Sequence, residues 1–79
     1  MRRAEVAPDP ATHGPGGHPH PQFILNYFEV FRATYGDALP LPDLYDRRNG
    51  WVHFNGRSAR MREIVELTER GRSQLAGEA

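Results

Sequence analysis

The sequence predicts a mostly α-helical fold, a compact domain of three helices with one short strand, although a small α+β fold is also possible. In two stretches, residues 22–35 and 58–71, apolar residues recur at three and four residue steps, as they do on one face of a helix. The first 21 residues hold five of the seven prolines and little that is apolar, which predicts a disordered tail. We therefore expect a tail at 1–21, a helical domain at 22–75 and a disordered end at 76–79.

Length and composition limit what such a domain can be. Seventy-nine residues allow one domain with a small core, so a homodimer or docking on a larger partner is possible. The absence of cysteine excludes disulfides and thiolate metal sites. No apolar run is long enough for a membrane span or a signal core, so we expect a cytoplasmic protein without a membrane partner.

The tail carries three of the four histidines, His13, His18 and His20, in a setting of glycine and proline. Imidazoles on a flexible segment can chelate a metal ion loosely, but a specific site needs ligands held by a fold. We favour a solvated tail, expect no metal and no cofactor, and expect residues 1 to about 20 to be dispensable for folding.

The first helix is predicted at residues 22–35. Pro21 suits the start of a helix, and Gly36 follows as a stop. One stripe of this helix is apolar and mostly aromatic, and it should supply most of the core: Phe23, Ile24, Tyr27, Phe28, Phe31 and Tyr35. A partner-binding surface or a platform for stacked bases is the alternative interpretation.

After a proline-rich connector at 37–42, a short helix is predicted at residues 43–48. Pro42 can occupy its first position, and Asn49-Gly50 would end it. On this helix Leu44 and Tyr45 would turn inward, whereas Arg47 and Arg48 would turn outward.

Residues 51–54 have the composition of a strand, and Asn55-Gly56 is a strong turn signal. A hairpin would need residues 57–60 as its second strand, but they lack an apolar alternation. We therefore expect one short strand, or an extended turn, that runs directly into a helix. His53 has no serine, cysteine or carboxylate placed beside it by sequence, so a packed or surface histidine is favoured over a catalytic one, and we expect no enzyme.

The main helix is predicted from the cap residue Ser58 to Gly71, which can close a helix. Its buried stripe would be Met61, Ile64, Val65 and Thr68, widened by Leu67. Between residues 47 and 72 there are seven arginines and three glutamates, although the formal charge of the whole chain is zero. An anionic partner would therefore meet the C-terminal half of the chain.

The order of these predicted elements across residues 23–75, with the ending Leu67-x-x-x-Gly71, resembles the helix-turn-helix core of small winged-helix repressors. The turn at 49–57 is longer than the usual tight turn, and the chain ends before two wing strands could form. The resemblance implies that the helix starting at Ser58 enters the major groove of DNA. Arg57, Arg60 and Arg62 would then meet base edges, and Arg47 and Arg48 would meet phosphates.

The sequence thus predicts a small DNA-binding transcriptional regulator of helix-turn-helix type. The alternative is a small phage or mobile-element protein that inhibits a host nucleic-acid machine through protein contacts, because size and charge pattern look similar to those of anti-CRISPR or polymerase-inhibitor proteins. No catalytic residue is predicted. The candidate binding residues are Arg47, Arg48, Arg57, Arg60 and Arg62.

Overall fold

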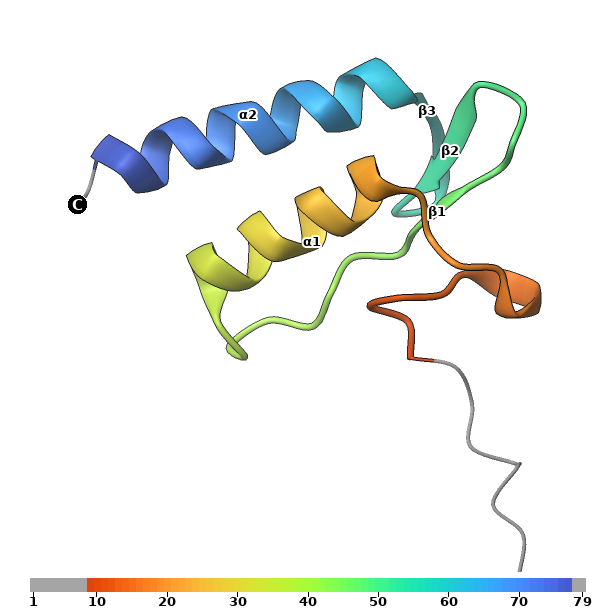
Figure 1. Ribbon diagram of the computed structural model, residues 1–79, viewed down its shortest axis with the longest axis horizontal. Coiled ribbons are helices and arrows are strands. Elements are labelled where there is room, and N and C mark those ends of the chain that lie inside the picture. The colour runs from red at the N-terminus through yellow and green to blue at the C-terminus, as the bar shows by residue number, and fades with distance from the viewer. Residues whose placement is uncertain (1–8, 78–79) are drawn as a thin grey trace, which may run out of the picture.

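The computed structural model describes residues 9–77. Its elements are the 3₁₀ turn η1 (Pro15–Gly17), the helices α1 (Gln22–Tyr35) and α2 (Met61–Gly77), and the strands β1 (Leu44–Asp46), β2 (Trp51–Phe54) and β3 (Arg57–Arg60). The strands form one antiparallel sheet in the order β1-β2-β3, and both helices run away from it side by side in the same direction (Figure 1). This is an α+β fold, so the predicted three-helix, helix-turn-helix-like domain is wrong.

Helix α1 has the bounds that its sequence predicts. Gly36 has a φ of 60° and its N–H donates to the carbonyl of Arg32 at 2.8 Å, which closes the last turn. The predicted core stripe is only partly right. Ile24 and Phe28 are buried, but Tyr35 is 48% exposed, and Val30, outside the stripe, is buried instead.

Strand β1 stands where a short helix was predicted at 43–48. Leu44 pairs with Phe54 and Tyr45 pairs with His53, so Leu44 points to the core while Tyr45 points to the opposite face. A helix of six residues would leave most of its backbone N–H groups without intrahelical partners. Pairing with β2 provides such partners, which explains the strand.

Strands β2 and β3 form the hairpin that the sequence analysis rejected. Asn55 and Gly56 have φ angles of 50° and 87°, the left-handed pair that a tight two-residue turn requires. Ser58 therefore lies within a strand opposite His53 and does not cap a helix, which begins only at Met61. Of the four residues of β3 only Ala59 is buried. The sequence of β3 therefore lacks the apolar alternation from which a strand is predicted.

Helix α2 starts later and ends later than predicted. Ile64 and Thr68 are buried as expected, whereas Met61 is 50% exposed because it follows β3 at the rim of the core. Gly71, predicted as the stop, lies inside the helix. A Cβ on Gly71 would be 2.5 Å from Cγ1 of Val30, so its missing side chain lets α1 and α2 approach closely.

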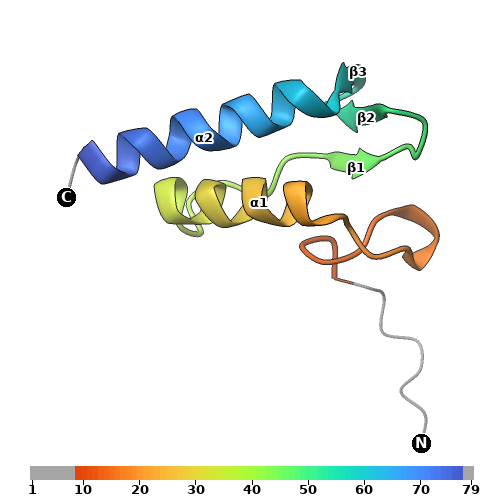
Figure 2. The same cartoon turned by 45° about the horizontal axis from the view of Figure 1, so that its top comes forward.

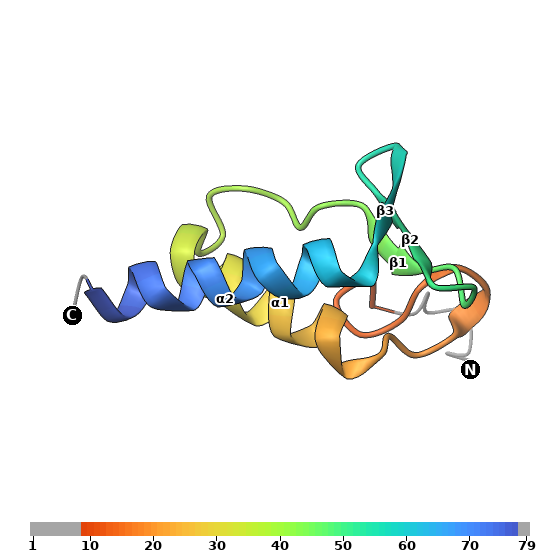
Figure 3. The same ribbon diagram turned by 90° about the horizontal axis from the view of Figure 1, so that it is seen from above.

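The core lies between one face of the sheet and the first turns of both helices. We call this face of the sheet the inner face. Figures 2 and 3 show both helices on this side of the sheet. The buried cluster consists of Ile24, Phe28, Leu44, Val52, Phe54, Ala59 and Ile64. Within the described part of the chain, no helix is both long and apolar enough to cross a lipid bilayer.

Part of the predicted tail packs on the domain. His20 is only 8% exposed, its Nε2 is hydrogen-bonded to the carbonyl of Pro10 at 3.0 Å, and its ring meets Phe28 edge-on with the centroids 5.4 Å apart. Residues 1–8 of the predicted tail and residues 78–79 of the predicted disordered end lie outside the described residues, while Ala76 and Gly77 belong to α2.

Candidate functional site

The second face of the sheet points away from both helices and carries most of the polar and aromatic side chains of the strands. We call it the outer face. Because side chains alternate along a strand and paired residues share a face, its members follow from the register. They are Tyr45, Trp51, His53, Ser58 and Arg60, together with Arg47 directly after β1.

Trp51 and Arg60 are cross-strand partners at one end of the outer face. The guanidinium carbon of Arg60 lies 4.1 Å from the centroid of the indole, a cation–π contact. Trp51 is 37% exposed despite this cover. Such a contact at an exposed site contributes about 0.5 to 1 kcal/mol, so it orients both groups without locking them together. The result is a positively charged and accessible pair.

Arg47 lies across the same face. Its Nη1 donates to the Oγ of Ser58 at 3.2 Å, although Arg47 follows β1 and Ser58 belongs to β3. Its backbone N–H donates to the carbonyl of Trp51 at 3.0 Å, which fixes the turn between β1 and β2. Arg47 and Arg60 are therefore brought to one surface.

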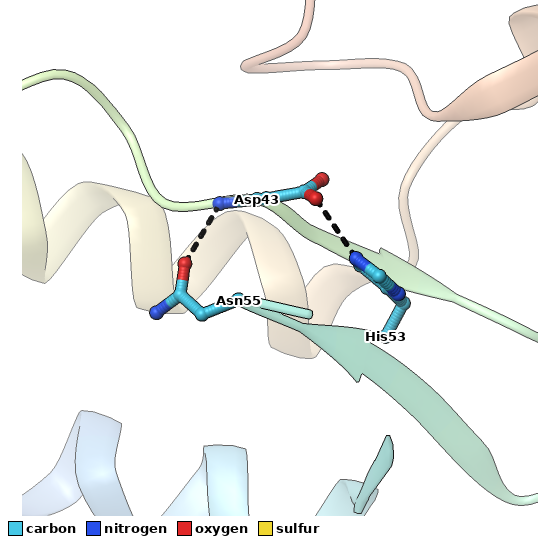
Figure 4. Close-up of polar contacts among 3 residues, drawn as sticks. All are labelled: Asp43, His53 and Asn55. Atoms are coloured by element: carbon cyan, nitrogen blue, oxygen red, sulfur yellow. Dashed lines mark hydrogen bonds and ion pairs between the residues drawn. The ribbon is translucent and has the colours of Figure 1, made fainter. Parts of the chain in front are cut away.

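Tyr45 and His53 form a stacked pair in the middle of the face. Their ring centroids are 4.7 Å apart and the ring planes differ by 13°. The Nε2–H of His53 donates to Oδ2 of Asp43 at 2.8 Å (Figure 4). Two hydrogen bonds also join Asp43 to Asn55. The backbone N–H of Asp43 donates to Oδ1 of Asn55 at 3.2 Å, and the backbone N–H of Asn55 donates to the carbonyl of Asp43 at 2.7 Å. These contacts tie the connector before β1 to the β2–β3 turn.

The partners of His53 were not found from the sequence. Asp43 lies ten residues away, and only the register of the sheet brings the two side chains together. Ser58 is the cross-strand partner of His53, but its Oγ accepts from Arg47, and within the described residues no side-chain hydrogen bond joins Ser58 to His53. A nucleophile and the base that activates it are normally within hydrogen-bond reach of one another. The Asp43–His53 pair instead orients the imidazole beside Tyr45.

Arg57, also predicted as a binding residue, lies away from the outer face. Its Nη2 donates to Oε2 of Glu63 at 2.6 Å, and its guanidinium lies 5.3 Å from the ring of Phe54. The hydrogen bond from Arg57 holds the pKa of Glu63 below its ordinary value, and the same bond raises the pKa of Arg57. The charge of Arg57 is thus largely balanced by its neighbour.

The remaining two predicted arginines are exposed but do not lie on the outer face. Arg48 sits in the β1–β2 turn with a φ of 64°, and its backbone N–H donates to Oδ1 of Asp46 at 3.1 Å. Arg62 is exposed near the start of α2. The structure therefore places Arg47 and Arg60 on the outer face and Arg48 in the adjoining turn, and it leaves Arg57 and Arg62 elsewhere.

Charge on the outer face is mainly positive. Residues 44–60 contain four arginines and one acid, Asp46. Asp43, at the edge of the face, is engaged by His53. Within residues 9–77, Arg47, Arg48 and Arg60 form no ion pair with a carboxylate, in contrast to Arg57. On the outer face, an anion would therefore meet Arg47 and Arg60, which have no carboxylate partner among the described residues.

The described residues contain no group of three or more histidine or acidic side chains that could hold a metal ion. The histidines of the predicted tail have separate surroundings. His20 is buried, Nδ1 of His13 is hydrogen-bonded to Oγ1 of Thr12 at 2.8 Å, and His18 is exposed.

Comparison of the chain with known protein families, with curated proteins and with solved structures found no match.

Proposed function

We propose that the protein binds nucleic acid through the outer face of its sheet. The observation that supports this most directly is the Trp51–Arg60 contact on the outer face, with Arg47 on the same surface. Arginines on a binding surface neutralise phosphates and release counterions, and an accessible indole can stack on a base. This replaces the predicted docking of a recognition helix, because residues 57–60 form a strand.

The two strands of the hairpin allow a matched test. Arg60 lies on the outer face, whereas Arg57, three residues earlier on β3, is held by Glu63 on the other side. Arg60→Ala should weaken binding of a fluorescein-labelled oligonucleotide, measured by anisotropy at several salt concentrations. If Arg60 contacts a phosphate, the slope of log affinity against log salt should become shallower by about 0.7 to 0.9.

Arg57→Ala should leave both the affinity and the salt slope close to those of the parent. Equal losses in the two variants would point to a general effect of charge, and unchanged binding in Arg60→Ala would remove the outer face from consideration. Circular dichroism of each variant would show that the fold is retained.

A protein partner is the second candidate, in line with the predicted inhibitor of a host nucleic-acid machine. It is favoured by the apolar groove between the far halves of α1 and α2, where Tyr27, Phe31 and Leu67 line the walls, and by the 48% exposure of Tyr35 nearby. Capture of a partner from a lysate that persists after nuclease treatment, and is lost in Tyr35→Ser but not in Arg60→Ala, would support this function over the first.

A further inference from the structure

We infer that the nucleic acid bound by the outer face is single-stranded, and that one of its bases stacks on Trp51. This inference rests on the proposed function. In a duplex the faces of the bases are covered by their neighbours, and a protein reaches only base edges and phosphates. In a single strand the faces themselves are open to aromatic side chains and guanidinium planes.

Several side chains of the outer face contact one another. Arg60 covers one part of the indole of Trp51, and Arg47 extends over the sheet to Ser58. His53 is parallel to Tyr45 and bonded to Asp43. The polar groups of Arg47 and His53 are therefore engaged within the face. Trp51, in contrast, stays 37% exposed, and an exposed indole suits the face of a base.

The surroundings of the outer face also favour one strand over two. The loop containing η1 lies beside β1, where Gly14 and His18 share a hollow with Tyr45 and Arg48. The approach is close, because a Cβ on Gly14 would be 3.2 Å from Cβ of Tyr45. The major groove of B-DNA, about 12 Å wide, admits an α-helix or a two-stranded β-ribbon. This sheet has three strands, and the loop borders its β1 edge, so the surface suits a single strand better than a duplex.

Trp51 is also well placed relative to positive charge. It immediately follows the β1–β2 turn, and its backbone N–H donates to Oδ1 of Asn49 at 3.1 Å. Arg47 and the exposed Arg48 belong to the same turn. A base stacked on Trp51 would thus bring its own phosphate group toward two arginines that form no ion pair within the described residues. Stacking and phosphate contact would occur together.

Trp51 is the only tryptophan of the chain, so its intrinsic fluorescence reports the proposed stack directly. The full-length protein would be titrated with a twelve-residue oligothymidylate, the corresponding oligouridylate and a twelve-base-pair DNA duplex. We expect quenching of Trp51 by single strands and affinity for them at least about ten-fold above that for the duplex. Comparison of the oligothymidylate with the oligouridylate shows whether DNA or RNA is preferred.

Two substitutions at the stack refine the test. Trp51→Ala should reduce single-strand affinity by about ten-fold or more, whereas Trp51→Phe, which keeps a ring, should remain within about three-fold of the parent. Tyr35→Ala is the matched control, since Tyr35 is an exposed aromatic residue at the far end of α1, and it should bind as the parent does.

The outcomes separate the inference from the proposed function. Duplex binding as tight as single-strand binding, or binding without a change in Trp51 fluorescence, would overturn the single-strand inference and leave nucleic-acid binding intact. Absence of binding to all three probes would overturn both. If Trp51→Ala does not fold, the quenching of the parent and the affinity of Trp51→Phe still decide the question.

Discussion

Gly71 occupies a position inside α2 where glycine normally costs stability relative to alanine. Its neighbour explains the exception, because a Cβ would lie 2.5 Å from Cγ1 of Val30. From the sequence, a glycine that ends a helix and a glycine that admits a neighbouring helix look the same. The prediction of a helix end at Gly71 therefore could not have been corrected without knowing which residue of α1 packs there.

Gly71→Ala should lower the free energy of unfolding by about 1 to 3 kcal/mol, because Val30 or the helix itself must shift to admit the methyl group. Gly77→Ala is the control, since a Cβ there meets nothing within 4 Å. It should be neutral or stabilise by up to about 1 kcal/mol. Urea denaturation followed by circular dichroism would measure both, and stabilisation by Gly71→Ala would contradict the close helix contact.

The Arg57–Glu63 pair makes a small, pH-dependent contribution to stability. Because the pKa of Glu63 is lowered in the folded protein by the hydrogen bond from Arg57, the contribution is present above the ordinary carboxyl pKa and is lost as the pH falls through the lowered value. Glu63→Gln removes it. The difference in melting temperature between parent and variant should be steady near neutral pH and shrink in acid.

Both side chains of this pair are substantially exposed, so the difference should be small and should decrease with added salt. Thermal melts between pH 7 and pH 3 at low ionic strength would follow it. A difference that grows as the pH falls would show that Glu63 acts on stability in some other way.

Among the secondary-structure elements, those that are long and have a periodic apolar pattern were predicted from the sequence. Helix α1 was correct at both ends because a four-turn apolar pattern is bounded by Pro21 and Gly36. Strands β1 and β3 were missed because three or four residues contain too few apolar positions to show a period: Leu44 alone faces the core from β1 and Ala59 alone from β3. Their pairing partners in β2 decide their conformation.

Helix α1 also permits a graded test of its packing. Phe28 belongs to the buried core, so Phe28→Ala should cost about 3 to 5 kcal/mol, enough to unfold much of a domain this small. Phe31 is only partly buried and lines the groove between α1 and α2. Phe31→Ala should cost about 1 to 2 kcal/mol. Chemical denaturation would compare them, and equal losses would indicate that the groove is more closed than the structure shows.

For the whole molecule, only part of the candidate site could be predicted from the sequence. Arginine content pointed to residues 47–72, and of the five candidate arginines Arg47 and Arg60 lie on the outer face. Trp51 was regarded only as a strand former, because its proposed role depends on facing away from the core beside Arg60. Which arginines share a surface is a property of the register, and sequence spacing does not determine it.

The loop before α1 is expected to stabilise the whole domain, contrary to the expectation from its composition. Removal of residues 1–20 deletes His20, which fills a site against Phe28 and bonds to Pro10. A loss of about 1 to 2 kcal/mol would lower the melting temperature by about 4 to 16 °C. A chain starting at Asp9 retains these contacts and serves as the control. If both truncations melt like the parent, the loop contributes nothing.

Helices α1 and α2 run in the same direction, and this arrangement affects the order in which the elements fold. Residues of the β2–β3 hairpin are close in sequence, and α2 follows β3 without a break, so this unit can form with little loss of chain entropy. Contacts of α1 with α2, such as Val30 with Gly71, join distant parts of the chain. We expect α1 to dock after the transition state has formed, so that weakening this contact accelerates unfolding and leaves the refolding rate nearly unchanged.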